Sequence, residues 1–169
     1  LTAENIFQIQ DEISKAIVLE LNGRIDLLPD ANKPLTKSTK ALEAYLKGKA
    51  AYATRDAEDI ETGITELIRA VTLDPEFAVA HAKLARAYSL ATEYGELASV
   101  NANPRAQIHI EKALALAPDD SEVLSDYAWW LNSSEASTDK IAAAFDAAIA
   151  ANPNNADAHR GKGFVLMNN

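Results

Sequence analysis

Apolar residues recur every three or four positions along most of this chain. In residues 4–22 they form one stripe, made of Ile6, Ile9, Ile13, Ile17 and Leu21. This spacing is typical of an amphipathic helix. Residues 24–39 contain two prolines and show no sustained period, so we expect a linker in which Ser38 or Thr39 caps the next helix. The pattern predicts an N-terminal helix in 1–23, which could end an upstream domain, a linker in 24–39 and a helical array in 40–169.

The helical pattern after residue 40 repeats. Three segments align on Pro75, Pro118 and Pro153, and each has a helix rich in small residues, the proline, and a second helix. The prolines are 43 and 35 residues apart. A unit of roughly 34 residues with insertions explains both spacings. Proline ends each helix because it cannot continue the backbone hydrogen bonding.

Residues 41–169 resemble the tetratricopeptide repeat (TPR), which has small, aromatic and proline residues at fixed slots. The best copy has His81, Leu84, Ala85, Tyr88, Ala106, Ile110, Ala113 and Pro118 in these slots. The resemblance implies an all-α fold, a superhelical solenoid of about three and a half repeats, with an extra N-terminal helix. The small slots Gly48, Ala85, Ala128 and Gly163 are expected to let a partner helix approach closely.

The repeats predict at least seven helices, no strands, and antiparallel pairs joined near 55–58, 94–103 and 133–137. The longest insertion runs from Thr92 to Arg105. It can project from one edge of the solenoid, or it can lengthen the two helices of its pair. The sequence leaves both possibilities open.

A second resemblance concerns the N-terminal segment. The residues "NIFQIQDEISKAIVLEL", followed by a linker and "ALEAYLKGKAAY", are similar to the junction before repeat arrays in bacterial proteins that carry a TolB-like domain. Such proteins often also carry a winged-helix regulator or a nucleotide-cyclase domain. The resemblance implies a module of a larger bacterial regulatory or signalling protein.

Charge and composition narrow the classes of partner. The 169 residues carry a formal net charge of -9 and contain no cysteine. An acidic chain argues against nucleic-acid binding, which needs concentrated lysine and arginine. No apolar run is long enough to span a membrane. The lack of cysteine fits the bacterial cytoplasm and periplasm equally well.

The sequence shows no pattern of catalytic or metal-binding chemistry. His81, His109 and His159 are far apart, and no thiolate pair, HExxH motif or calcium loop is present. We expect the histidines to pack or to face solvent. We therefore predict that the chain is not an enzyme and that it needs no metal or cofactor.

In TPR proteins the first helix of each repeat lines a concave surface, and this resemblance supplies the candidate binding residues. They are Tyr45, Lys49, Tyr52, Arg86, Ser125, Trp129, Asn132 and Arg160. Aromatic and basic residues together suit an extended protein or peptide segment that carries an acid and an apolar anchor against Trp129. Trp129 could instead pack between repeats. Glu122, Asp126 and Asp157 lie on the same helices, so the groove is expected to be mixed in charge.

Two further expectations concern the partner. Members of the family that bind chaperone tails clamp a terminal carboxylate with lysine and asparagine. The corresponding slots of the first repeat hold Tyr45 and Lys49, which argues against the same recognition. The alternative to ligand binding is a structural role, in which the array self-associates as a homo-oligomer or supports another domain.

Overall fold

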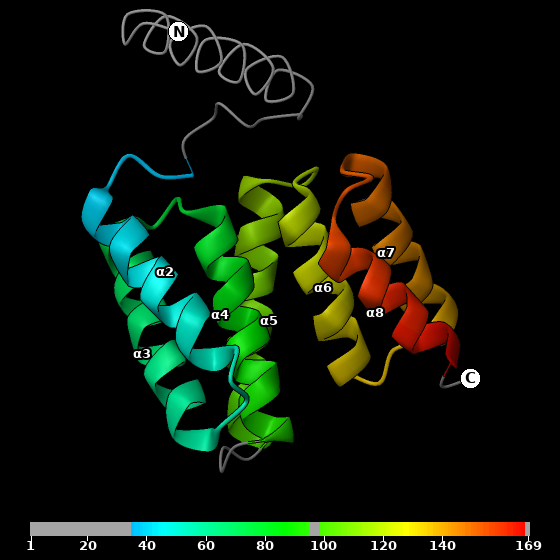
Figure 1. The fold of residues 1–169 in the computed structure, drawn as a ribbon, viewed down its shortest axis with the longest axis horizontal. Helices are drawn as coiled ribbons and strands as arrows, with labels where there is room; N and C mark the ends of the chain where they lie inside the picture. Colours follow the sequence, from blue (N-terminus) through cyan, green and yellow to red (C-terminus); the bar gives the residue numbers. More distant parts are fainter. Residues whose placement is uncertain (1–34, 95–98, 168–169) are drawn as a thin grey trace, which may run out of the picture. The chain divides into compact units, whose positions relative to one another are not determined.

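The computed structural model describes residues 35–94 and 99–167, and these form seven α-helices and no strand (Figure 1). The helices are α2 (Thr39–Tyr52), α3 (Ala57–Leu73), α4 (Ala78–Glu93), α5 (Ser99–Leu116), α6 (Ser121–Ser133), α7 (Thr138–Ala151) and α8 (Ala156–Met167). The predicted all-α fold is confirmed. The predicted helix at 4–22 and the linker up to residue 34 lie outside the described residues. None of the described helices is long and apolar enough to cross a membrane.

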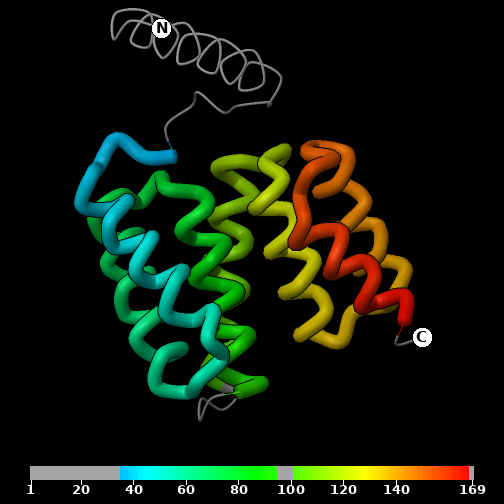
Figure 2. The backbone as a smooth tube through the Cα atoms, viewed as in Figure 1, coloured from blue at the N-terminus to red at the C-terminus, as the bar shows by residue number. Residues whose placement is uncertain are grey.

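Consecutive helices pack as antiparallel pairs, α2 with α3, α4 with α5, and α6 with α7, while α8 packs on α6 and α7 (Figure 2). The first helices of successive pairs also contact one another, α2 with α4, α4 with α6, and α6 with α8. Three pairs followed by α8 correspond to the expected three and a half repeats. The described helices therefore follow one another in sequence order, as in a solenoid.

The insertion in the second repeat lengthens a helix. Of the two possibilities left open by the sequence, the longer helix is the one observed, because α5 begins at Ser99, within the junction predicted near 94–103, and contains Pro104. Ala102 and Ala106 are both buried, four residues apart on one helical face. Their burial favours helix over loop, and only the short stretch 95–98 lies outside the described residues.

Local sequence signals fix where the helices start and turn. Ser38, one of the two predicted cap residues, is the N-cap of α2, and its hydroxyl accepts a hydrogen bond from the Ala41 amide. Asp56 and Asp120 cap α3 and α6 in the same way. Each of the three aligned prolines lies in the turn between one helix pair and the next.

Two histidines tie these turns to the helices that follow them. His81 Nε2 lies 3.1 Å from the Pro75 carbonyl oxygen, and His159 Nε2 lies 2.9 Å from that of Pro153. In both cases the ring nitrogen donates and the carbonyl accepts. The histidine follows its proline by six residues in both repeats, so the two contacts are equivalent.

Small residues allow the helices of a pair to approach closely. Ala85 and Ala128 are fully buried, as predicted. A Cβ atom on Gly48 would lie 2.9 Å from the carbonyl oxygen of Gly63 on α3, so glycine is required at this crossing.

The prediction for Gly163 is wrong. A Cβ atom there would meet nothing within 4 Å, because no described helix covers that side of α8. Gly161 makes the close contact instead, since a Cβ atom on it would lie 2.3 Å from the ring of Phe145 on α7.

Candidate functional site

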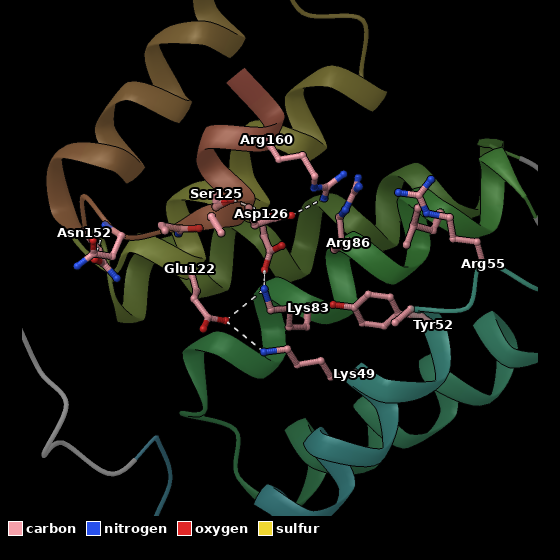
Figure 3. Close-up of a pocket in the computed structure, with 16 residues that line it drawn as sticks. Lys49, Tyr52, Arg55, Lys83, Arg86, Glu122, Ser125, Asp126, Asn152 and Arg160 are labelled. Atoms are coloured by element: carbon pink, nitrogen blue, oxygen red, sulfur yellow. Dashed lines mark hydrogen bonds and ion pairs between the residues drawn. The ribbon is translucent and has the colours of Figure 1, made fainter. Parts of the chain in front are cut away.

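A groove with a volume of about 490 Å³ runs along the first helices α2, α4, α6 and α8 (Figure 3). Its lining includes five cationic side chains and three acidic ones, a local excess of positive charge in a chain of net charge -9. The cations are Lys49, Arg55, Lys83, Arg86 and Arg160, and the acids are Glu122, Asp126 and Asp157. The expectation of a groove that is mixed in charge is met.

Lys83 and Asp126 form a buried ion pair at the floor of this groove. Lys83 Nζ lies 2.9 Å from Asp126 Oδ2 and 3.2 Å from Glu122 Oε2. The Asp126 side chain is only 2% exposed. The geometry of the contact between Lys83 Nζ and Asp126 Oδ2 is that of an ion pair and not of a hydrogen bond. No described residue donates a hydrogen bond to Asp126 Oδ2.

The network shifts the pKa values of its members. Burial raises the pKa of Asp126, and Lys83 offsets this shift only in part. Burial lowers the pKa of Lys83, but Asp126 and Glu122 outweigh burial and hold the pKa well above its usual value. Burial likewise raises the pKa of Glu122, yet Lys83 and Lys49 outweigh it and keep the pKa below its usual value. Lys83 therefore stays charged and is neutralised by acids of this chain.

Trp129 lies between repeats. It is 5% exposed and packs edge-on against Phe145 of α7 with ring centroids 5.3 Å apart. Its indole nitrogen donates a hydrogen bond of 3.0 Å to Asp157 of α8. Trp129 was expected to offer an open apolar face to a ligand. This expectation is wrong, because α7, α8 and nearby arginines already cover the ring.

Two arginines lie over the Trp129 ring and face the groove. The guanidinium carbon of Arg86 is 4.3 Å from the ring centroid, and that of Arg160 is 5.0 Å away. Figure 3 shows their tips side by side. Arg160 is paired with Asp157. Burial lowers the pKa of Arg86; Asp126 and Asp157 offset this shift only in part, and the positive charge of Arg160 adds to it.

Five of the eight predicted residues line the groove, namely Lys49, Tyr52, Arg86, Ser125 and Arg160. Trp129, Tyr45 and Asn132 do not. Tyr45 is 2% exposed and packs on Phe77, with ring centroids 5.0 Å apart. Asn132 lies near the end of α6, outside the lining.

Several lining residues were not among the candidates for ligand contact. Lys83 precedes Arg86 by three positions and Leu90 follows it by four, so helical spacing alone could have placed all three on one face. Arg55 and the α7–α8 turn carrying Asn152, Asn154 and Asn155 also line the groove. No periodic signal in the sequence could have found these turn residues.

Comparison with known proteins identifies the architecture. No protein-family model matches the chain, and no curated protein matches it. Among solved structures, the Sgt2 TPR domain from Aspergillus fumigatus matches with a TM-score of 0.60 and 17% identity, over 79% of this chain and 82% of that one. The described helices therefore have the superhelical fold of such TPR domains.

A second TPR domain is similar to this one. The first TPR of Spaghetti (RPAP3), bound to the HSP90 peptide SRMEEVD, matches with a TM-score of 0.56 and 16% identity, over 79% of this chain and 95% of that one. Identities this low establish the fold alone. In this superhelix, the described residues contain no cluster of three or more His, Cys, Asp or Glu side chains that could hold a metal ion.

Proposed function

We propose that this chain is a non-enzymatic protein-interaction module that binds an extended, acidic peptide segment in the groove along α2, α4, α6 and α8. The observation that carries the proposal is the cationic excess of the groove within an otherwise acidic protein. Such a contrast favours acidic partners and discourages basic ones. The RPAP3 domain of similar fold is bound to a peptide with adjacent acidic residues, which supports the same class of partner.

The recognition we propose differs from a clamp on a chaperone tail. Tyr45 occupies one of the two compared slots and is buried against Phe77, so it offers no charge to a ligand. Lys49 occupies the other slot and lies 4.0 Å from Glu122. The partner is therefore defined by its acidic side chains rather than by the sequence of a particular tail.

The test is a peptide array probed with the intact chain. Blocked peptides with acidic, neutral or basic side chains are compared, and the charge-reversed variant Lys49→Glu is compared with Lys47→Glu. Both lysines lie on α2 and are about half exposed, but only Lys49 lines the groove. We expect acidic peptides to bind best. Lys49→Glu should weaken their binding by at least about threefold at low salt, and Lys47→Glu should leave it unchanged.

Two results would contradict the proposal. One is an array in which binding does not depend on peptide charge. The other is an equal loss of binding in Lys49→Glu and Lys47→Glu, which would show that only the overall charge of the protein matters.

Self-association is a second candidate, favoured by the apolar end of α8. Phe164, Leu166 and Met167 are 43%, 61% and 81% exposed there. A homo-oligomer through this face would support the structural role considered from the sequence. Sedimentation at increasing concentration tests it, because a constant monomer mass would exclude self-association in that range.

We further propose, on the N-terminal resemblance, that the module serves a larger bacterial regulatory or signalling protein. The residues behind this proposal, 4–22, lie outside the described structure, and no comparison supports the likeness to TolB-like proteins. Reading the coding sequence upstream of Leu1 tests the proposal, and an unrelated upstream sequence would overturn it.

A further inference from the structure

Most cations in the groove already have an acidic partner within the chain. Lys83 contacts Asp126 and Glu122, Lys49 approaches Glu122, and Arg160 pairs with Asp157. Two cations lack such a partner, because no carboxylate of the described residues lies within 4.0 Å of Arg55 or Arg86. Arg55 is exposed and donates a hydrogen bond to the Tyr94 hydroxyl, whereas Arg86 is half-buried. Asp126 and Asp157 act on Arg86 only from beyond this distance, so a ligand carboxylate in direct contact would offset more of the cost of burying its charge.

The position of Arg86 is held by its surroundings. Its guanidinium carbon lies 4.3 Å from the centroid of the Trp129 ring. Trp129 is itself fixed by its hydrogen bond to Asp157 and by its contact with Phe145. The guanidinium plane is therefore ordered before any ligand arrives, which lowers the entropy lost on binding.

We propose that Arg86, with Arg160 beside it, forms a subsite for a single aspartate or glutamate side chain of the bound segment. This inference rests on the proposed function and names the recognition step within it. A guanidinium donates two parallel hydrogen bonds to the two oxygens of a carboxylate, in a planar, bidentate contact. The ligand carboxylate supplies the partner that Arg86 lacks and offsets the repulsion between the two arginines.

The neighbouring acids select a carboxylate over a phosphate. Asp126 and Asp157 both act electrostatically on Arg86, and Asp157 also pairs with Arg160. A phosphate group carries nearly two negative charges, and Asp126 and Asp157 would repel the second charge.

The location of Arg86 favours an internal side chain over a chain end. Arg86 lies on α4, with lining residues from α2 on one side and from α6 and α8 on the other (Figure 3). An extended segment that reaches Arg86 can therefore continue in both directions along the groove.

The chain contains two tryptophans, which provide a direct readout. The Trp129 indole lies under Arg86, whereas Trp130 stacks on Tyr127 and does not line the groove. Nuclear magnetic resonance of the full chain labelled with ¹⁵N resolves both indole groups, and Trp130→Phe assigns them. The probe is a heptapeptide blocked at both ends, with one central glutamate among uncharged residues.

Three comparison peptides isolate the chemistry of the ligand. One has a central glutamine, one has a central phosphothreonine, and one has a neutral centre with a free terminal carboxylate. We expect the glutamate peptide to shift the Trp129 indole signal and to bind at least about fivefold more tightly than each of the others. The Trp130 signal should stay unchanged.

Protein variants test the role of Arg86. Arg86→Gln is expected to weaken the binding of the glutamate peptide by at least about fivefold. Arg69→Gln is the matched control, because Arg69 is an exposed arginine on α3 that pairs with Glu66, and this variant should bind normally. If Arg86→Gln does not fold, the glutamate and glutamine peptides still decide the matter on the unmodified protein.

The results separate this inference from the proposed function. The subsite is overturned if the phosphothreonine or free-terminus peptide binds more tightly than the glutamate peptide, or if folded Arg86→Gln binds the glutamate peptide as well as the unmodified chain does. The proposed function survives either result as long as Lys49→Glu still weakens the binding of acidic peptides. Binding of the glutamate peptide without a change at the Trp129 indole also overturns it. If no acidic peptide binds the full chain, both proposals fail.

Discussion

At the scale of single residues, two glycines two positions apart on α8 have opposite surroundings. A Cβ atom on Gly161 would lie 2.3 Å from the Phe145 ring, while one on Gly163 would meet nothing within 4 Å. Phe145 is fully buried and cannot move aside easily. The repeat register had assigned the close contact to Gly163, and the packing of α8 on α7 assigns it to Gly161 instead.

Alanine at these two positions should therefore have opposite effects. Gly161→Ala should lower the free energy of unfolding by about 1–3 kcal/mol through overpacking. Gly163→Ala should be neutral or raise it by up to about 1 kcal/mol, because alanine favours helix over glycine. Urea denaturation followed by circular dichroism measures both variants, and an equal loss in the two would show that α8 packs differently.

Trp129 shows at the same scale how a side chain can serve a site without contacting the ligand. Its ring is almost fully buried, but Arg86 and Arg160 lie over it. The tryptophan orders the cations that line the groove, so its effect on binding would be indirect.

At the scale of helices, a histidine pair joins α4 to α5. His81 Nδ1 lies 2.9 Å from His109 Nδ1, and the rings stack with centroids 5.2 Å apart. Because His81 Nε2 donates to the Pro75 carbonyl, Nδ1 of neutral His81 accepts and Nδ1 of His109 donates. Protonation of His81 would place two donors opposite each other.

This pair should make the fold sensitive to acid. Burial lowers the pKa of His81, and burial together with His81 lowers the pKa of His109 to about 4. The unfolded chain, with histidine pKa values near 6.5, then binds more protons than the folded one between pH 6.5 and 4. This pair should therefore remove about 1–2 kcal/mol of stability as pH falls through that window.

Replacement of His109 tests this assignment. His109→Gln can still donate to His81 but cannot titrate, so its stability should depend less on pH between 6.5 and 4 than that of the unmodified chain. His159→Gln, which removes a histidine on α8, should keep the original dependence. Equal acid sensitivity in both variants would rule out the pair as the cause.

At the scale of the whole molecule, burial is uneven along the array. In α4, 12 of 16 residues are buried, and the helix contacts α2, α3, α5 and α6. In α8, 3 of 12 residues are buried, and the helix contacts α6 and α7. In a solenoid each unit is stabilised mainly by its neighbours, so local stability should follow these contacts.

Hydrogen exchange should show the gradient directly. Amides of α4 should exchange slowest and those of α8 should exchange markedly faster, since local opening of α8 exposes less apolar surface. Mass spectrometry of peptic fragments after timed exchange measures both. Equal protection of α4 and α8 would show that the array unfolds only as one cooperative unit.

The sequence by itself determined the helices and their pairing. Apolar spacing, the cap at Ser38 and the prolines at 75, 118 and 153 act over a few residues, so they can be read without knowing the rest of the chain. The alanines at 85 and 128 follow from the same period. These signals indicated paired helices, and the resemblance to the tetratricopeptide repeat then implied the all-α superhelix.

Only the tertiary structure decided which side chains face the groove. Trp129 and Tyr45 were candidate ligand contacts, but α7, α8 and the turn before α4 bury them. The ion pair of Lys83 with Asp126 joins two residues that are 43 positions apart in the sequence. The same holds for Gly163, whose slot is open because no described helix covers it. Helical periodicity assigns a residue to one face of its helix, but burial and ion pairing depend on the helices that pack against that face.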